Sequence, residues 1–348
     1  MWRVHWQVLV GGANATIGMR PYLMEVEVVD RDGIESDTCR LLFDDAFGQL
    51  ALPKVRSPVQ VLLNGVEVFD GVVDSTPWRL SRGGGRVLEV NCKAFDTRGK
   101  ATEPQLWNGD DMSLKDALAK AGQLAGYTVT VDPGFAEIMR DYWSPSGMSF
   151  VEWGEKLRRE FGATFKVRGK QAVFAGRGGG QSPRGGALPV VLASCRPGGN
   201  VISADIDPSK GRPRSKTKRV RYFDRKAAQF RELDVDIELP DLGDAIDTQR
   251  WLAVDEGQAS DQAKGHKSDA EQDAGIGSVE MTIAPEAMAE GALVLSGARP
   301  GIDGRYRISG AVHKANRSGG ATTRCELAQP QNGAGSDTRS STSAIARP

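Results

Sequence analysis

Short segments in which apolar and polar residues alternate fill the first hundred residues of the chain. In residues 24–28, Met and Val alternate with two Glu. In residues 88–94, Leu, Val, Cys and Ala alternate with Glu, Asn and Lys. A period of two is typical of half-buried β-strands. The clearest local signal is VQVLLNGVEVF, where Asn64 and Gly65 can adopt the positive φ angles of a two-residue hairpin turn. We therefore predict an antiparallel, barrel-like β-domain over residues 1–104.

The N-terminal segment MWRVHWQVLV belongs to the same pattern. Its Trp and Val residues alternate with Arg, His and Gln, whereas a signal peptide needs a continuous apolar core. We expect a strand here. No window of the sequence approaches the length of a membrane span, which favours a soluble intracellular protein.

The spacing of apolar residues changes to that of a helix in the next part of the chain. Apolar residues between Ser113 and Gly126 form a helical stripe, and the strand-like YTVTV follows. A second unit repeats this plan, because Ser149 begins a helix, Gly162 ends it and ATFKV continues as a strand. The turn-forming DPG lies between the two units. We predict a middle α+β domain over residues 105–176 with two helix-Gly-strand units.

The remaining third of the chain again favours β-structure. The glycine-rich GRGGGQSPRGG, residues 176–186, buries little apolar surface and is predicted to be a linker or exposed loop. Residues 187–330 are predicted to form a second barrel-like β-domain with one polar helix. The expected strands lie near residues 201–206, 219–223, 279–283, 293–295 and 306–309, and the expected helix near 258–274. Residues 331–348 are polar and low in complexity, so we expect an extended tail or one that orders against a partner.

The predicted fold class is therefore mainly β with a smaller α+β part. In this organisation two barrel-like β-domains are joined by a middle helix-strand domain.

The sequence lacks the residue patterns of common catalytic sites. Histidine, the commonest general base, occurs only as His5, His266 and His313, and none of the three lies in a recognisable motif. We expect a surface or interface position for each. Acidic residues are too numerous for sequence alone to choose a pair of glycosidase carboxylates. We predict no catalytic residue, no cofactor site and no enzyme activity.

The four cysteines point to no metal or disulfide framework. Cys39, Cys92, Cys195 and Cys325 lie far apart, without a CxxC pair or a nearby His that would complete a zinc site. We predict no metal site, and we expect reduced, buried thiols.

Two charged segments follow one another in the C-terminal half. Lys and Arg total 45, as do Asp and Glu, so no global basic field attracts the protein to nucleic acid. Residues 210–226 are locally basic and carry Tyr222 and Phe223, the composition of a nucleic-acid patch. A solvated loop and hairpin edge, or a salt-bridging contact with an acidic neighbour, explains the same composition. Residues 232–238 alternate acidic and apolar side chains, so a strand there is expected to present a fully acidic face that repels DNA.

Four longer segments carry a resemblance to a known family. They are VVDRDGIESDTCRLLFDD, VQVLLNGVEVFDGVVDS, MSFVEWGEKLRREFGATFKVRGKQAVF and PGIDGRYRISGAVHKANRSGGATTRCEL. In this order they resemble the late control D protein family, the baseplate hub of contractile phage tails. That family is related in architecture to the hub part of type VI secretion spike proteins. The segment DYWSPSGMSF is more compact than the polar stretch that often precedes the family's central helix, which affects local contacts there.

The resemblance implies a structural protein that forms a homotrimeric ring around a channel. Two barrel-like domains per chain would give six similar units, which adapt a sixfold tail tube to a threefold spike. The implied partners are the central spike protein trimer, the tail tube or tube-initiator protein, the tape measure protein and the baseplate wedge proteins, with no membrane contact. The implied location is the virion tail baseplate, assembled in the bacterial host cytoplasm and used in DNA ejection. As a hypothesis, the acidic face of residues 232–238 lines the channel and keeps DNA from adhering.

Three other functions stay open at this point. The same fold would serve a tailocin or a secretion device that carries no DNA. A tail-tip peptidoglycan hydrolase is the second alternative, which a zymogram would reveal. A nucleic-acid-binding module acting through residues 210–226 is the third, and its binding would depend steeply on salt.

Overall fold

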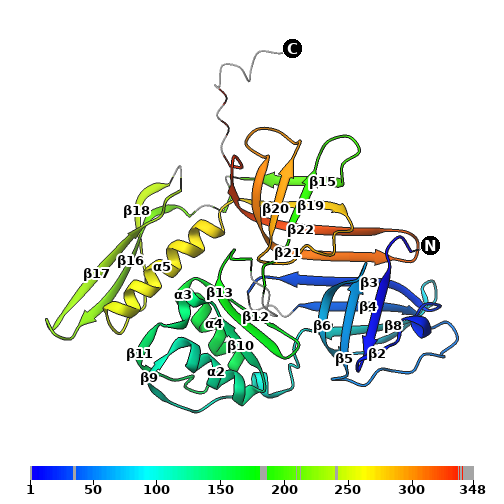
Figure 1. Cartoon of the computed structure of the whole chain (residues 1–348), viewed down its shortest axis with the longest axis horizontal. Coiled ribbons are helices and arrows are strands. Elements are labelled where there is room, and N and C mark those ends of the chain that lie inside the picture. Colours follow the sequence, from blue (N-terminus) through cyan, green and yellow to red (C-terminus); the bar gives the residue numbers. More distant parts are fainter. Residues whose placement is uncertain are drawn as a thin grey trace.

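The computed structural model describes residues 2–33, 37–180, 186–208, 210–211, 213–239, 242–335, 337 and 339. Figure 1 shows four parts, namely two β units, a middle unit that contains helices, and an arm that projects to one side. Strands far outnumber helices, so the predicted fold class, mainly β with a smaller α+β part, is confirmed. No helix in these residue ranges is long and apolar enough to cross a membrane.

The N-terminal unit is a curved antiparallel sheet around an aliphatic core. Its elements are β1 (Trp6–Val10), β2 (Ala13–Asn14), α1 (Thr16–Met19), β3 (Leu23–Arg31), β4 (Thr38–Asp44), β5 (Pro58–Leu63), β6 (Val66–Ser75), β7 (Trp78–Ser81) and β8 (Gly85–Lys93). The strand order is β3-β4-β8-β6-β5-β1-β2. Asn64 and Gly65 have φ angles of 49° and 83°, so the predicted turn between β5 and β6 is confirmed. Val8, Val61 and Phe69 are fully buried because alternate residues of these strands face the same core.

The middle unit packs two helices against a three-stranded sheet. Its elements are η1 (Lys100–Thr102), β9 (Gly109–Ser113), α2 (Leu114–Ala125), β10 (Thr128–Val131), α3 (Pro133–Ala136), β11 (Met139–Trp143), α4 (Phe150–Phe161), β12 (Ala163–Arg168) and β13 (Gln171–Gly176). The sheet order is β10-β13-β12. Ser149 and Glu152 form a reciprocal capping box at α4. Gly126 and Gly162 end α2 and α4 with positive φ angles.

Both predicted helix-Gly-strand units are therefore present in the middle unit. One local expectation needs correction, and one further element was not expected. The expected turn at Asp132 is the N-cap of the short helix α3, because the Asp132 side chain accepts a hydrogen bond from the Gly134 amide. The ribbon formed by β9 and β11 has no clear signal in the sequence.

The C-terminal unit extends the sheet of the N-terminal unit. Its elements are β14 (Val190–Ser194), β15 (Val201–Asp207), β19 (Ile276–Thr282), β20 (Ala292–Ser296), β21 (Gly304–Asn316) and β22 (Ala321–Gln331). The order is β15-β19-β22-β21, and β21 pairs with β3 from Gly310↔Arg31 to Asn316↔Glu25. The two β units thus share one 14-stranded sheet, whose path stays open at β15 and β2 within the residues described. The strand expected near residues 306–309 is the beginning of the much longer β21.

The arm is a separate sheet backed by one helix. It consists of β16 (Ser215–Asp224), β17 (Gln229–Asp236), β18 (Gly243–Thr248) and α5 (Glu256–Gln272), with the strand order β17-β16-β18. Its small core contains Val220, Tyr222, Ala253, Ala259 and Ala263. The strand expected near residues 219–223 therefore belongs to the arm and not to the large sheet. Helix α5 is the polar helix predicted near residues 258–274.

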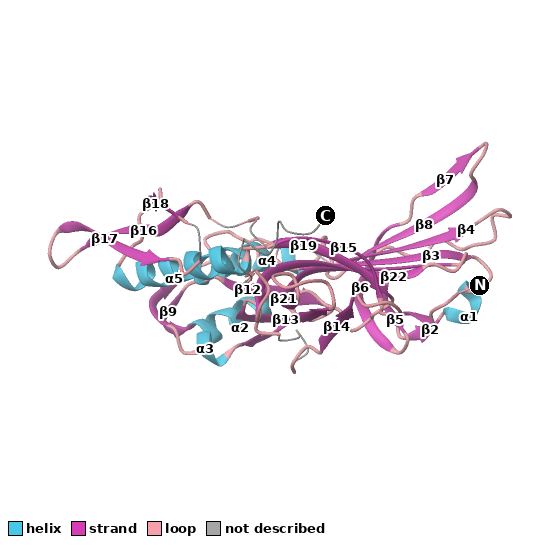
Figure 2. Cartoon of the chain, turned by 90° about the horizontal axis from the view of Figure 1, so that it is seen from above, coloured by secondary structure: helices cyan, strands magenta, loops and turns pink. Residues whose placement is uncertain are grey.

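Two glycines let the arm approach the middle unit closely. A Cβ atom on Gly265 of α5 would lie 2.7 Å from the Glu160 carbonyl oxygen and 2.8 Å from the Gly162 amide nitrogen. Only glycine permits backbone contact at this distance. Arg140 of β11 adds ion pairs to Glu160 at 3.0 Å and to Asp261 of α5 at 3.2 Å. The arm is therefore attached through α5, while its strands project away from the body (Figures 1 and 2).

Candidate functional site

A charged cavity of about 760 Å³ lies where the four parts of the chain meet. Its walls come from the residues that follow β3 and β13, from α4 and the end of α5, and from β15, β19, β21 and β22. Five Lys or Arg and six Asp or Glu side chains are among the described residues that line it. Because these charges nearly balance, the cavity offers no strong field for a free anion or cation.

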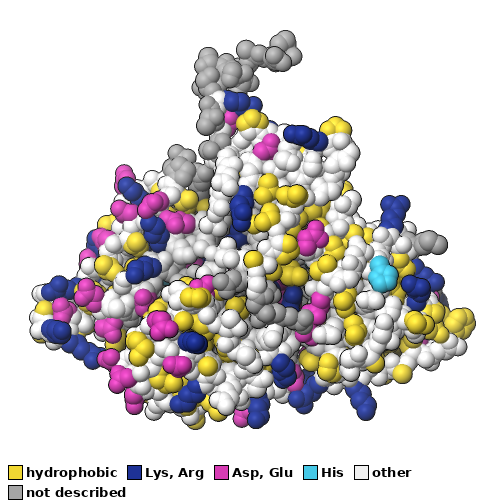
Figure 3. All heavy atoms as spheres, in the orientation of Figure 1, with side chains coloured by type: hydrophobic (Ala, Val, Ile, Leu, Met, Phe, Trp, Pro, Cys, Tyr) yellow, Lys and Arg dark blue, Asp and Glu magenta, His cyan; other side chains and the backbone are white. Residues whose placement is uncertain are grey.

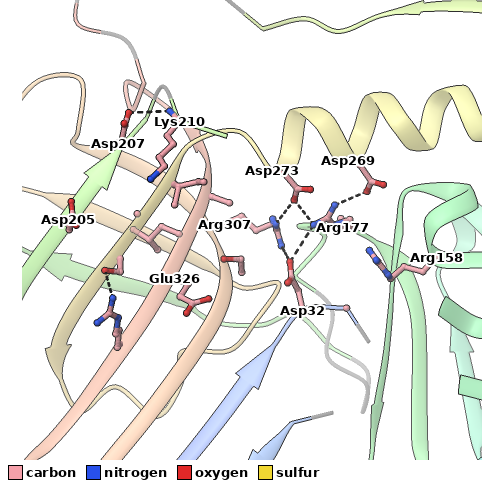
Figure 4. A pocket seen from close by; sticks show the side chains of 18 residues that line it. Asp32, Arg158, Arg177, Asp205, Asp207, Lys210, Asp269, Asp273, Arg307 and Glu326 are labelled. Atoms are coloured by element: carbon pink, nitrogen blue, oxygen red, sulfur yellow. Dashed lines mark hydrogen bonds and ion pairs between the residues drawn. The ribbon is translucent and has the colours of Figure 1, made fainter. Parts of the chain in front are cut away.

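Two arginines hold this junction together, as Figure 4 shows. The Arg177 guanidinium contacts Asp269 and Asp273 at 2.7 Å each and Asp32 at 3.4 Å. Arg307 Nη1 contacts Asp32 Oδ2 at 2.5 Å. Burial lowers the pKa of Arg177, but the carboxylates of Asp273 and Asp269 raise it more, so this pKa lies above its usual value. Only 8% of the Arg177 side chain and 3% of the Arg307 side chain are exposed, so loss of a partner would leave a buried charge uncompensated.

Glu290 connects this network to the segment between the middle and C-terminal units. Its carboxylate lies 3.2 Å from Arg307 Nη1 and accepts a hydrogen bond of 2.5 Å from the Gly178 amide. Only 4% of the Glu290 side chain is exposed. The junction is therefore a buried structural network that joins segments distant in sequence.

A second charged cluster is buried between the three main units. Asp30 of β3 and Asp37 before β4 face Lys166 and Arg168 of β12. Lys166 Nζ contacts Asp30 Oδ1 and lies 3.3 Å from Asp37 Oδ1, and Arg168 Nη2 lies 3.4 Å from Asp37 Oδ2. The Ala289 amide donates to Asp30 Oδ2 at 3.1 Å, which connects the C-terminal unit. Two carboxylates and two cations therefore offset each other at a buried site.

The two carboxyl groups of this cluster differ in pKa. Burial raises the pKa of Asp30, but Lys166 and Arg168 lower it more. Burial and the neighbouring Asp30 charge raise the pKa of Asp37 to about 6. A raised carboxyl pKa is one property of a general acid. However, only 2% of the Asp37 side chain is exposed, and the cavity beside Asp30 has a volume of about 10 Å³, room for roughly one water molecule. A sugar or peptide substrate does not fit there.

The histidines differ in part from the sequence expectation. His313 lies inside β21 with 1% of its surface exposed, so its predicted surface or interface position is wrong. Its ring nitrogens lie 3.0 Å from Thr323 Oγ1 and from the Ala287 carbonyl oxygen. Burial lowers its pKa to about 4, so at pH 7 it is a neutral hydrogen-bonding group of the core. His5 is exposed, as expected, and His266 is half-buried on α5.

The cysteines are free thiols, and three of them are buried. Cys39, Cys92 and Cys325 are buried as expected, whereas Cys195 is only half-buried. Burial raises the pKa of Cys92 and of Cys325 to about 12, which makes these thiols unreactive. Within the part of the chain that the structure describes, no group of His, Cys, Asp and Glu side chains is arranged to hold a metal ion.

The basic and acidic segments pair with each other in the arm. Arg219 of β16 lies opposite Asp234 of β17 and binds both of its carboxylate oxygens at 2.7 Å. Lys267 of α5 binds Glu238 at 2.7 Å. Figure 3 shows cationic and acidic side chains interspersed over the arm. The face expected to be fully acidic is therefore a mixed-charge face, and the salt-bridging alternative explains the basic composition best. The acidic neighbour is the next strand of the same chain.

The predicted linker at residues 176–186 contains a residue of the buried junction that the sequence does not reveal. Residues 181–185 lie outside the described residues. Arg177, at the start of the segment, is one of the two central residues of the junction, and the surrounding glycines conceal that role. The predicted tail, residues 331–348, begins at the end of β22, and most of it also lies outside the described residues.

Solved structures with a similar fold include two tail proteins and a secretion component. The tail protein from Neisseria meningitidis MC58 has a TM-score of 0.68 and 14% identity, over 93% of this chain and 96% of that chain. The prophage MuSo2 43 kDa tail protein from Shewanella oneidensis has a TM-score of 0.68 and 13% identity, over 93% of this chain and 98% of that chain. An E. coli component of the type VI secretion system, similar in structure to bacteriophage T4 tail proteins gp27 and gp5, has a TM-score of 0.54 and 10% identity, over 95% of this chain and 79% of that chain.

No family model matches the sequence, and no curated protein matches it. The structural likeness nevertheless covers almost the whole chain, so the chain has the fold of these tail proteins and of the secretion component. The resemblance that the sequence indicates is confirmed at the level of the fold.

Proposed function

We propose that this chain is the structural baseplate hub of a contractile tail. The observation that carries the proposal is the fold shared, over nearly the full length of both chains, with two tail proteins, one of them from a prophage. The same fold in a type VI secretion component supports a part that phage tails and related injection machines have in common. In this role the protein provides structure and assembly contacts and is not an enzyme.

In the proposed assembly, three chains form a ring around a channel. Each of the three chains supplies two β units, so the ring contains six similar units. These meet a sixfold tail tube on one side, and the ring meets a threefold spike on the other. The pairing of β21 with β3 supports this arrangement because it fixes the two units of one chain side by side. We propose domains at residues 1–104, 105–176 and 187–330, with the arm inserted in the last and a tail at 331–348. Separate buried clusters support this division.

The proposed partners are the spike trimer, the tail tube or tube-initiator protein, the tape measure protein and the baseplate wedges. The proposed location is the virion tail baseplate, after assembly in the host cytoplasm, and the channel would serve DNA ejection. If residues 232–238 line the channel, they do so as a mixed-charge face, because Arg219 and Lys267 offset part of their acidic charge.

Quantitative mass spectrometry of purified tail particles tests the proposal. We expect about three copies per particle, equal to the spike, and co-purifying capsid proteins distinguish a phage from a tailocin or secretion device. Absence from the particles, or a copy number close to that of the tube protein, would overturn the hub assignment.

A tail-tip peptidoglycan hydrolase has less support. Among the carboxyl groups with a raised pKa, Asp37 is enclosed and Asp261 is paired with Arg140. The carboxylates of Asp32, Asp269 and Asp273 at the junction are also bound to arginines. A zymogram with purified protein checks this alternative, and we expect no clearing.

A further inference from the structure

A β-hairpin of the N-terminal unit extends beyond the core that the rest of this unit encloses. Figure 2 shows β7 and the start of β8 projecting from the sheet. Trp78 lies opposite the buried Leu88, and Leu80 lies opposite Arg86. The Trp78 and Leu80 side chains are therefore on the same face of the sheet as the core residues, but in the part of the hairpin that extends beyond the core. Trp78 is 47% exposed and Leu80 62% exposed.

The loop beside this hairpin adds to the same exposed surface. Asp45 accepts a hydrogen bond of 3.0 Å from Trp78 Nε1, which places the loop against the hairpin, and its Phe47 is 82% exposed. Arg82 and Arg86 are exposed and have no ion-pair partner among the described residues. We call Phe47, Trp78, Leu80, Arg82 and Arg86 the hairpin patch. It combines exposed apolar surface with unpaired positive charge, which marks an interaction site.

A surface of opposite charge lies on the ribbon of β9 and β11 in the middle unit. Met139 is 59% exposed and Tyr142 is 56% exposed. Asp110, Asp111 and Asp141 are exposed, and within the described residues none of them has a cationic partner. Asp110 and Tyr142 lie opposite each other on one face of the ribbon, whereas Met139 and Asp141 lie on the other face. We call these five residues, which are exposed on both faces of the ribbon, the ribbon patch.

Arg140, the cation of β11 itself, does not offset the charge of the ribbon patch. Arg140 is turned inward, where it binds Glu160 and Asp261 and lies over the rings of Trp143 and Phe161. The ribbon patch is therefore apolar and acidic, as the hairpin patch is apolar and basic.

We infer that the hairpin patch of one chain binds the ribbon patch of a second copy. The two patches belong to parts near opposite ends of the long axis in Figure 1, where β8 lies to the right and β9 and β11 lie to the left. Contact between two different surfaces is heterologous, and it closes into a ring when the rotation between copies allows closure. The inference rests on the proposed trimeric hub and names the contact that builds it. Opposite unpaired charges guide the encounter, and the aromatic and aliphatic side chains provide the buried area.

Charge reversal in the full-length chain tests this contact. One variant carries Arg82→Glu and Arg86→Glu, a second carries Asp110→Lys and Asp111→Lys, and a third carries all four substitutions. Sedimentation velocity at low salt measures the dissociation constant of the self-assembled species. We expect each single-patch reversal to raise that constant by at least about tenfold, and the four-substitution chain to return close to the wild-type value.

The matched control reverses two exposed cations elsewhere. Arg225 and Lys226 lie in the turn between β16 and β17, and Arg225→Glu with Lys226→Glu should leave assembly unchanged. Circular dichroism confirms that each variant is folded. If a reversal variant unfolds, Arg82→Ala with Arg86→Ala provides the same test at exposed positions.

The outcomes separate the inference from the hub proposal. A wild-type trimer that both reversals leave intact overturns the inference and leaves the hub proposal standing. A wild-type chain that does not self-associate overturns the inference and also counts against the trimeric ring. Loss of assembly in both reversals, with recovery in the four-substitution chain, supports the contact.

Discussion

The buried cluster around Asp37 predicts a specific dependence of stability on pH. Asp37 has a pKa of about 6 in the folded chain, against 3.8 for an unperturbed aspartate. Between these two values the folded state keeps a proton that the unfolded state has already lost. The folded state therefore binds more protons, and the free energy of unfolding falls as pH rises from about 4 to about 6. Below this window the contribution of Asp37 is fully present, and above it the contribution is lost.

The magnitude follows from the two pKa values. A factor of ten in proton affinity corresponds to about 1.4 kcal/mol, so the interval from 3.8 to about 6 corresponds to about 3 kcal/mol at this site. Asp30 acts in the opposite direction, because Lys166 and Arg168 lower its pKa despite its burial. Its stabilising contribution is present above about pH 4 and is lost only as pH falls below that value, so it does not overlap the Asp37 window.

Urea denaturation of the wild-type chain and of Asp37→Asn at a series of pH values isolates this effect. Titrating groups outside this cluster are shared by the two chains, so they cancel in the difference between their free energies of unfolding. We expect wild type to lose about 3 kcal/mol relative to Asp37→Asn between pH 4 and pH 6. If the stability of wild type relative to Asp37→Asn stays flat over this window, or rises with pH, Asp37 does not have a raised pKa in the folded chain.

Three further perturbations test the junction, the arm and a helix cap. Arg307→Met should lower the free energy of unfolding by about 3–5 kcal/mol because it leaves the buried Glu290 carboxylate without its cation. Arg305→Met on the same strand should be nearly neutral, and similar losses from both would contradict the junction's role. Gly265→Ala should loosen the arm, because the added Cβ atom overlaps the backbone of the middle unit and lowers stability by about 1–3 kcal/mol. The expected sign is faster hydrogen exchange in α5. Exchange no faster than in the control Gly257→Ala, at an exposed site of the same helix, would count against the contact. Ser149→Ala should cost about 1 kcal/mol by removing the cap of α4, and an unchanged denaturation midpoint would argue against the capping box.

Local signals explain why so much of the fold can be predicted from the sequence. The turn at Asn64 and Gly65 depends only on residues that tolerate positive φ, and the cap at Ser149 and the stop at Gly162 depend on one turn of helix each. Alternation along the first hundred residues likewise follows from one buried face per strand. Each of these signals is contained in fewer than about a dozen residues.

The charged clusters could not be predicted because their partners are distant in the chain. Asp32 and Arg307 are 275 positions apart, and Lys166 and Asp30 are 136 apart. The alternation in β12 suggests an exposed polar face, yet all six of its residues are buried, because Lys166 and Arg168 meet carboxylates from another unit. A cation's sequence context does not reveal which of many carboxylates it will bind. The same limit hid Arg177, which lies among glycines typical of a linker.

Electron cryomicroscopy of intact tail particles from the source cells tests the hub assignment itself. We expect density for this fold in a ring of about three copies between the tail tube and the spike, with the channel running through its centre. Absence of the fold from that position, or its presence in every ring along the tube, would contradict the assignment as a baseplate hub.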